Sequence, residues 1–373
     1  MRRRAFTLIE LLLAMTLLVA FGALLLRFVS GSLEVWRRSE ATRELGEKST
    51  AIFELLSRDL RALHPLRVHE SPRPNRARFQ AELAAVDRNG DRVPETVLRR
   101  LRFVRALEAA EEWRTLEAIV ARDPGRPGAR AEALAELPGD GLGEVAWASA
   151  PDRSSEDPAL LSLYRGARPL FLDPAGSFFR DGFFAAPATL GGDLREVAAG
   201  VLEFAFLFPV AGAGAWSQVD ADRPPPSASP CWDSTRGLAL DLRVHAANRF
   251  ALEKGEASAA DPKDDVFPSR ALVTLVLERS GPGRFPKLVQ PVGPADRALE
   301  VDDPRGFPRV TPFLAKVEGE WVEVSGVSGK ALALGRRGAR ETPPSAHLAG
   351  SLVHTGQTFR AEFPLEAGRE DGG

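Results

Sequence analysis

The sequence predicts an α+β protein in which one long N-terminal helix packs on a β-rich head and a small all-β module follows. Residues 6–64 contain no proline and keep a helical pattern throughout. Residues 65–282 hold short apolar runs between turn residues, which is typical of strands. After residue 282 the composition shifts while short strand-like runs continue. We therefore expect a head over 65–282, a C-terminal module over 283–367 and a tail over 368–373.

The two halves of the predicted helix differ in character. Residues 6–29 are apolar nearly all round and long enough to cross a bilayer. Residues 30–64 are amphipathic, because apolar residues recur at spacings of three, four and seven between charged ones. Pro65 ends the pattern. The amphipathic stripe consists of Leu45, Ile52, Leu55, Leu56, Leu60 and Leu63.

The start of the chain is basic, then apolar, with one acidic residue. Three arginines at positions 2–4 precede Ala5. Glu10 is the one charge inside the apolar stretch that begins at Phe6 and continues as the apolar run 11–26. An ionised carboxylate is costly there and usually has a partner. A secretory signal peptide fits less well, because no A-x-A-like site follows the run and a signal core has no use for Glu10. A plain single-span anchor leaves Glu10 and Ala5 unexplained.

The segment Arg-Arg-Ala-Phe-Thr-Leu-Ile-Glu-Leu-Leu, residues 3–12, resembles the class III leader of type IV prepilins and type II secretion pseudopilins. The resemblance implies that a prepilin peptidase/methyltransferase removes residues 1–5 by cutting between Ala5 and Phe6 and then methylates the Phe6 amine. It also implies that Glu10, the fifth mature residue, pairs with the N-terminal amine of a neighbouring subunit. Ala5 departs from the family, which usually has glycine before the cut.

Physical chemistry agrees with the role that the resemblance gives to Glu10. In hydrocarbon its carboxylate must be neutralised or paired. The amine of Phe6 on a neighbouring helix is a suitable cation, and a wrong register would leave both groups desolvated. We therefore expect the pair to select the assembly geometry more than it adds stability.

Composition and motifs argue against several other functions. The net charge of −2 over 373 residues is unlike a nucleic-acid surface. Cys231 is the one cysteine, which excludes an intrachain disulfide and a C-x-x-C site. No nucleophile elbow, phosphate loop or dinucleotide fingerprint occurs, so we expect neither an enzyme nor a cofactor. The histidines, which follow no metal-ligand spacing, are His64, His69, His245, His347 and His354.

The head is expected to hold strands with a helical insertion near 106–136. A turn-like run over 87–95 contains Asp87, Asn89 and Asp91, whose alternation makes them calcium candidates. The EF-hand template fails at its sixth and twelfth positions, and most such runs are simple turns. The expected head strands cover residues 79–83, 97–104, 143–148, 160–164, 201–208, 238–244 and 271–278.

The order of elements over residues 1–282 resembles the J-type minor pseudopilin. The resemblance rests on the strand Val-Leu-Glu-Phe-Ala-Phe-Leu-Phe at 201–208, a loop flanked by Trp216 and Trp232, and the strand Gly-Leu-Ala-Leu-Asp-Leu-Arg-Val at 237–244. The C-terminal module is extra to such a head. It resembles a small β module of bacterial and phage surface proteins, and we expect strands at 320–324 and 331–334 with 359–363 closing it.

These observations predict a minor pseudopilin-like subunit that helps to initiate or cap an inner-membrane filament of a type II secretion system. Its partners would be other pseudopilins or pilins. The arginines at 2–4 should stay cytoplasmic, which places the C-terminal region in the periplasm. Two alternatives stay open: a minor pilin of a type IV pilus, used for adhesion or DNA uptake, and a membrane-tethered substrate- or glycan-binding module.

Overall fold

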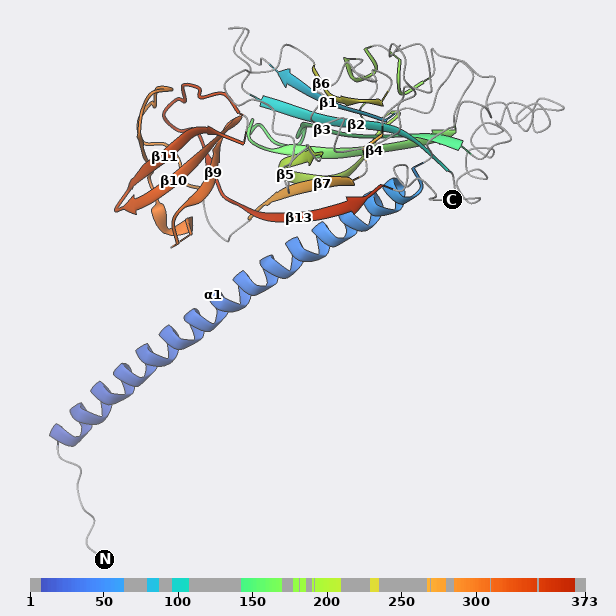
Figure 1. The fold of residues 1–373 in the computed structure, drawn as a ribbon. Coiled ribbons are helices and arrows are strands. Elements are labelled where there is room, and N and C mark those ends of the chain that lie inside the picture. Colours follow the sequence, from blue (N-terminus) through green and yellow to red (C-terminus); the bar gives the residue numbers. More distant parts are fainter. Residues whose placement is uncertain are drawn as a thin grey trace, which may run out of the picture.

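The computed structural model combines one long helix with two β-sheets (Figure 1). The α+β class expected from the sequence is confirmed at this level. The structure describes residues 8–63, 79–86, 96–106, 142–169, 177–180, 182–185, 190, 192–208, 229–234, 267–268, 270–279, 285–308, 310–340 and 342–365.

The helix α1 spans Leu8–Arg61, 54 residues or about 80 Å. Its ends lie close to the expected limits of 6 and 64. Only its C-terminal part lies against the head, while the rest extends away from both sheets (Figure 1). Just beyond α1, Leu63 forms an isolated antiparallel bridge with Arg105. The chain therefore passes directly from the helix onto the sheet.

The head is one eight-stranded sheet in which every neighbouring pair is antiparallel. Its apolar side chains alternate between two faces, and α1 packs on one of them. In spatial order the strands are β13 (Gly356–Pro364), β7 (Arg270–Glu278), β5 (Arg195–Leu207), β4 (Leu161–Pro169), β3 (Leu142–Pro151), β2 (Thr96–Ala106), β1 (Phe79–Val86) and β6 (Ser229–Asp233).

A separate five-stranded sheet forms the C-terminal module and has its own apolar core. The hairpin between its two longest strands turns through Gly329, whose φ of 59° suits glycine. In spatial order the strands are β12 (Val353–His354), β9 (Phe313–Val317), β10 (Glu320–Ser328), β11 (Ala331–Ala339) and β8 (Ala298–Glu300).

One strand assignment from the sequence is wrong. Residues 359–363 do not close the module, because they belong to β13 and pair with β7 of the head. Nine consecutive residue pairs join these strands without a register shift. Phe363 enters the head core, whereas Arg360 and Glu362 stay exposed on the other face. The module is thus inserted between two adjacent head strands.

The remaining predicted elements agree in part with the structure. Strands β6, β8, β9 and β12 were not predicted. The predicted strand 238–244 and residues 107–136 of the predicted helical insertion lie outside the described residues, and Ala106 is the last residue of β2.

Two cores lie on opposite faces of the head sheet. The larger joins α1 through Ile52, Leu56 and Leu60 to aromatic residues of the strands. The smaller contains Phe178 and Phe183 from the segment that crosses the other face. A further cluster joins the two sheets and consists of Leu202, Val276, Trp321 and Ala339.

Candidate functional site

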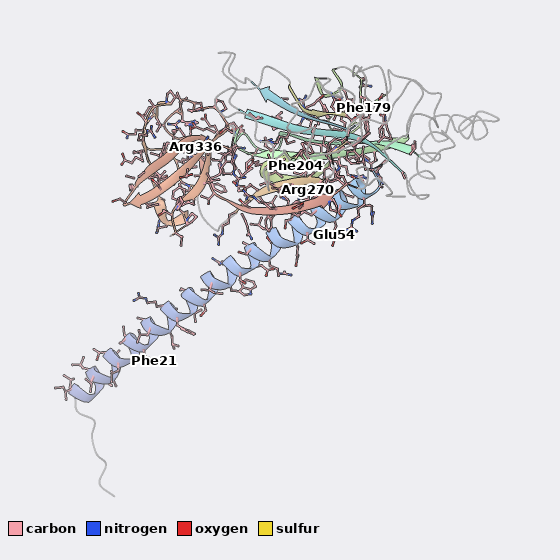
Figure 2. All side chains as sticks on the ribbon, in the orientation of Figure 1. Phe21, Glu54, Phe179, Phe204, Arg270 and Arg336 are labelled. Atoms are coloured by element: carbon pink, nitrogen blue, oxygen red, sulfur yellow. The ribbon has the colours of Figure 1, made fainter. Side chains whose placement is uncertain are left out.

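The N-terminal half of α1 presents an extended apolar surface. Its large apolar side chains are exposed from Leu8 to Trp36; Leu18, for example, is 71% exposed. Figure 2 shows Phe21 on this half, far from the head. Within the described residues, α1 is the one helix long and apolar enough to cross a membrane. This half therefore has no covering from the described part of its own chain.

The structure locates one of the predicted site residues. Glu10 lies in the first turn of α1, where a carboxylate suits the helix dipole. Its side chain is outside the described part. Ala5 and Phe6 precede the described residues, and so the predicted cleavage site is not tested. The calcium candidates Asp87, Asn89 and Asp91 also lie outside the described ranges.

A buried carboxylate joins the C-terminal half of α1 to the head. Asp59 is fully buried, and its Oδ2 accepts hydrogen bonds from Trp147 Nε1 at 2.9 Å and Arg165 Nε at 2.7 Å. Its Oδ1 accepts from Arg165 Nη2 at 2.6 Å. The buried Arg105 completes the group, with Nε 3.3 Å from Asp59 Oδ1. These three partners come from β3, β4 and β2, so a single helix residue is hydrogen-bonded to two strands and ion-paired with a third.

One feature of the sequence indicates this buried group, although Asp59 was not among the predicted site residues. Asp59 stands within the apolar stripe, between Leu56 and Leu60 on the side that the helix buries. An acidic residue in a buried stripe requires a partner. Its three partners could not be identified by spacing, because they lie 46, 88 and 106 positions away.

The helix separates from the head near Gly46. Ser49 Oγ and Thr50 Oγ1 both donate to the Gly46 carbonyl, at 2.8 and 2.9 Å. Lys48 donates from Nζ to the carbonyl of Ala199 on β5. Burial lowers the pKa of Lys48, although nearby acidic groups oppose this. Leu45 already packs against the head core, so contact with the head begins around Leu45 and continues through Lys48 toward Asp59.

A second set of buried charges joins the module to the head. His354 Nδ1 donates to Glu278 Oε1 at 2.5 Å and its Nε2 to Asp157 Oδ2 at 2.6 Å. Burial opposes the charged imidazole, but these two hydrogen bonds outweigh it and raise the pKa of His354 to about 9. Beside it, Lys316 donates to the carbonyls of Ala159 and Leu202 at 2.8 and 2.6 Å. Both cations belong to the module and all their acceptors to the head.

A similar group lies inside the module. His347 is bonded to Glu318 at 3.1 Å and to Glu320 at 2.8 Å, and Arg337 makes two bonds to Glu320. Burial would raise the pKa of Glu320, but the bonds from Arg337 and His347 lower it to about 2. In both groups each imidazole nitrogen faces a different carboxylate. Within the described ranges, no cluster of three or more His, Cys, Asp or Glu side chains is arranged to hold a metal ion.

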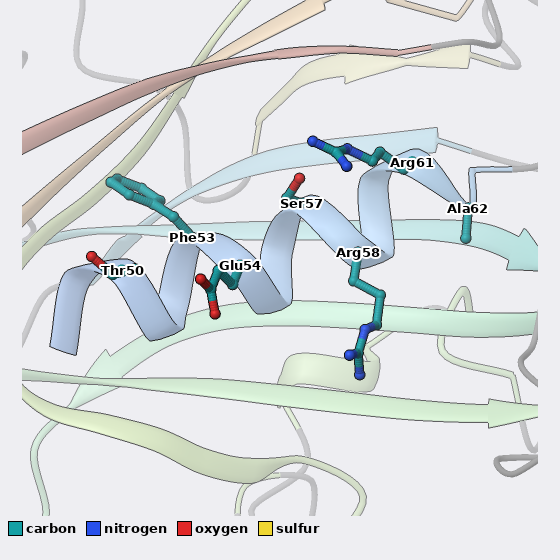
Figure 3. Close-up of a pocket in the computed structure, with 7 residues that line it drawn as sticks. All are labelled: Thr50, Phe53, Glu54, Ser57, Arg58, Arg61 and Ala62. Atoms are coloured by element: carbon teal, nitrogen blue, oxygen red, sulfur yellow. The ribbon is translucent and has the colours of Figure 1, made fainter. Parts of the chain in front are cut away.

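An open groove runs along the outer side of α1 where the helix meets the head (Figure 3). Glu54 and Arg58 point to one side of the helix, and Phe53 and Arg61 to the other. The lining includes no histidine or cysteine that could serve as a general base or nucleophile. The lining residues are Thr50, Phe53, Glu54, Ser57, Arg58, Arg61 and Ala62.

Compared with protein-family models, curated proteins and solved structures, the chain matches none of them.

Proposed function

We propose that this chain is a minor pseudopilin-like subunit that helps to initiate or cap an inner-membrane filament of a type II secretion system. One observation carries the proposal: an unbroken 54-residue helix is apolar and exposed in its N-terminal half and buried against a β-rich head in its C-terminal half. Soluble monomers rarely expose so large an apolar surface. The prepilin-like motif over residues 2–10 gives this surface a specific role.

In this proposal the prepilin peptidase/methyltransferase removes residues 1–5 and methylates the amine of Phe6. The mature chain crosses the inner membrane once, and its head lies in the periplasm. Glu10 accepts the Phe6 amine of a neighbouring pseudopilin or pilin. Because both groups would lie in a low dielectric, a wrong register leaves two desolvated charges, and the correct register is selected. The role is structural, and we assign the chain no catalysis.

The second candidate is a membrane-tethered module that binds a substrate or a glycan. The separate apolar core of the five-stranded sheet favours it. The buried contacts of His354 and Lys316 favour the first candidate, because they make the module an integral part of the head. A minor pilin of a type IV pilus would use the same anchor, and the two systems differ in which partners co-purify.

The substitution Glu10→Ala separates a filament subunit from a tethered binder. We expect the variant to accumulate in the membrane, because removing a charge eases insertion. It should lose co-purification with partner subunits and lose secretion or piliation, whereas Glu10→Asp should restore part of both.

Glu40→Ala is the matched control, since Glu40 is an acidic residue of the same helix that is already paired with Arg43. It should assemble normally. Full complementation by Glu10→Ala, with partner binding intact, would contradict the assembly role.

A further inference from the structure

The apolar surface of α1 changes sides along the helix. At about 100° per residue, Trp36 and Glu54 are separated by five turns and lie on the same side. Glu54 is exposed, while Ile52 and Leu56 on the other side are buried in the head core. By this spacing Trp36 lies on the side of α1 turned away from the head. Figure 1 shows both sheets on one side of the helix.

Three apolar residues form a stripe on that side. Val29, Leu33 and Trp36 follow at spacings of four and three, and they are 50%, 47% and 64% exposed. Arg27 is two and a half turns before Trp36 and so lies on the opposite, head-facing side. The head-facing side thus becomes polar at Arg27. The other side keeps large apolar residues for about 13 Å more, with the small Ser32 as the one polar residue among them.

The stripe ends at a sharp border. On the same side, the next turns carry Glu40, Arg43 and Glu47, and Arg43 bonds to both carboxylates, at 2.5 and 2.8 Å. These charges satisfy one another within the helix. Such an abrupt change from apolar to charged residues is expected where a helix passes from a membrane into water.

We propose that α1 leaves the bilayer obliquely. Val29, Leu33 and Trp36 then lie in the lipid headgroup layer on the side of the head, and Arg37 contacts the lipid phosphates. The inference rests on the proposed membrane span. If α1 stood perpendicular to the membrane, both of its sides would change from apolar to polar at the same height. Here the change occurs near Arg27 on one side and after Trp36 on the other, about 13 Å apart along the helix axis. A tilt toward the stripe brings these borders to one level.

The residue types fit this orientation. Tryptophan prefers the headgroup layer, where its ring is half covered and its N–H stays wet. Arg37, exposed next to Trp36, can reach phosphate oxygens, and Arg27 can extend along the upper side of the helix to the same layer. The head and the module then lie on the side of α1 turned away from the membrane.

Spin-label depth measurements on the full chain test this orientation. Cys231→Ser removes the native cysteine, and single labels are placed at Leu33→Cys, Gly31→Cys and Leu18→Cys in vesicles of phosphatidylethanolamine and phosphatidylglycerol. Position 33 is farther along the helix than 31 but on the stripe side. An oblique helix therefore places the label at 33 deeper than the label at 31, which reverses their order along the chain.

Each outcome decides a different point. A deep label at 18 with 33 deeper than 31 supports the oblique exit. A deep label at 18 with 31 deeper than 33 overturns the oblique exit and leaves the membrane span intact. Labels at 31 and 33 that are shielded from both lipid and water also overturn it, because a second helix would then cover the stripe. A label at 18 that is exposed to water overturns the span and the proposed function with it.

Discussion

The two halves of α1 share one continuous backbone and differ in everything that covers their side chains. Leu18 is 71% exposed, whereas Leu56 is fully buried. In the C-terminal half even a charged residue, Asp59, is buried, hydrogen-bonded to two strands and ion-paired with a third. Helices in proteins are stabilised mainly by packing of one face. In the part of the chain that the structure describes, only the C-terminal half of α1 receives that packing.

The largest effect should come from removing the charge of Asp59. Asp59→Asn keeps the shape of the side chain but leaves Arg105 and Arg165 without their buried counter-charge, which should cost about 3–5 kcal/mol. Denaturant unfolding of the full chain in detergent micelles, followed by tryptophan fluorescence, measures the loss.

Glu54→Gln is the control on the same half of the helix. Glu54 is exposed, and the change should be within about 0.5 kcal/mol. A wild-type unfolding midpoint in Asp59→Asn would show that this buried group does not hold the helix to the head.

A pair of identical substitutions sharpens the contrast between the halves. Leu56→Ala opens a cavity in the head core and should cost about 2–5 kcal/mol. Leu18→Ala removes the same atoms from an exposed position, and head unfolding should change by less than about 0.5 kcal/mol. Equal losses in the two variants would mean that the exposed half also packs on the head.

The joint between head and module should respond to pH. The pKa of His354 is raised from its ordinary 6.5 to about 9, so its stabilisation is complete below pH 6.5 and lost as the pH rises toward 9. The loss should reach at most about 3 kcal/mol. His354→Gln should abolish this alkaline slope in unfolding measurements between pH 6.5 and 9.

At acidic pH the stability of the same joint should change with pH in the opposite direction. Burial works to raise the pKa of Asp157, but the bonds from His354 lower it, so the contribution of Asp157 to stability is lost as the pH falls below the ordinary range for aspartate.

Arg305→Gln, at an exposed site in the module, is the control for His354→Gln and should keep the wild-type alkaline slope of stability against pH. An alkaline slope that persists in His354→Gln would assign the effect to another group.

The sequence predicted those parts of the fold that depend on local pattern. The unbroken helix was placed within three residues at each end, because a proline-free apolar stripe is a local signal. The alternation of Phe359, Ala361 and Phe363 predicted a strand correctly but could not show which sheet it joins. That choice depends on β7, more than eighty positions earlier.

The buried charged groups could not be predicted from the sequence, because their partners are also distant in the chain. His354 is bonded to residues 76 and 197 positions away, and no spacing rule connects them. Its apolar surroundings and its two carboxylates become visible only when the module is docked on the head. Glu10, by contrast, could be singled out from the sequence because its apolar neighbours are adjacent in the chain, and its assembly role stays a prediction.

The most direct test of the account is the mass of the native N-terminus. Protein isolated from the membrane should begin at Phe6 and carry a methyl group on that amine, and Ala5→Trp should retain the leader because the cut needs a small residue before it. Residues 1–5 still attached to the native protein, or a cut near Arg27, would contradict the pseudopilin-like function proposed here.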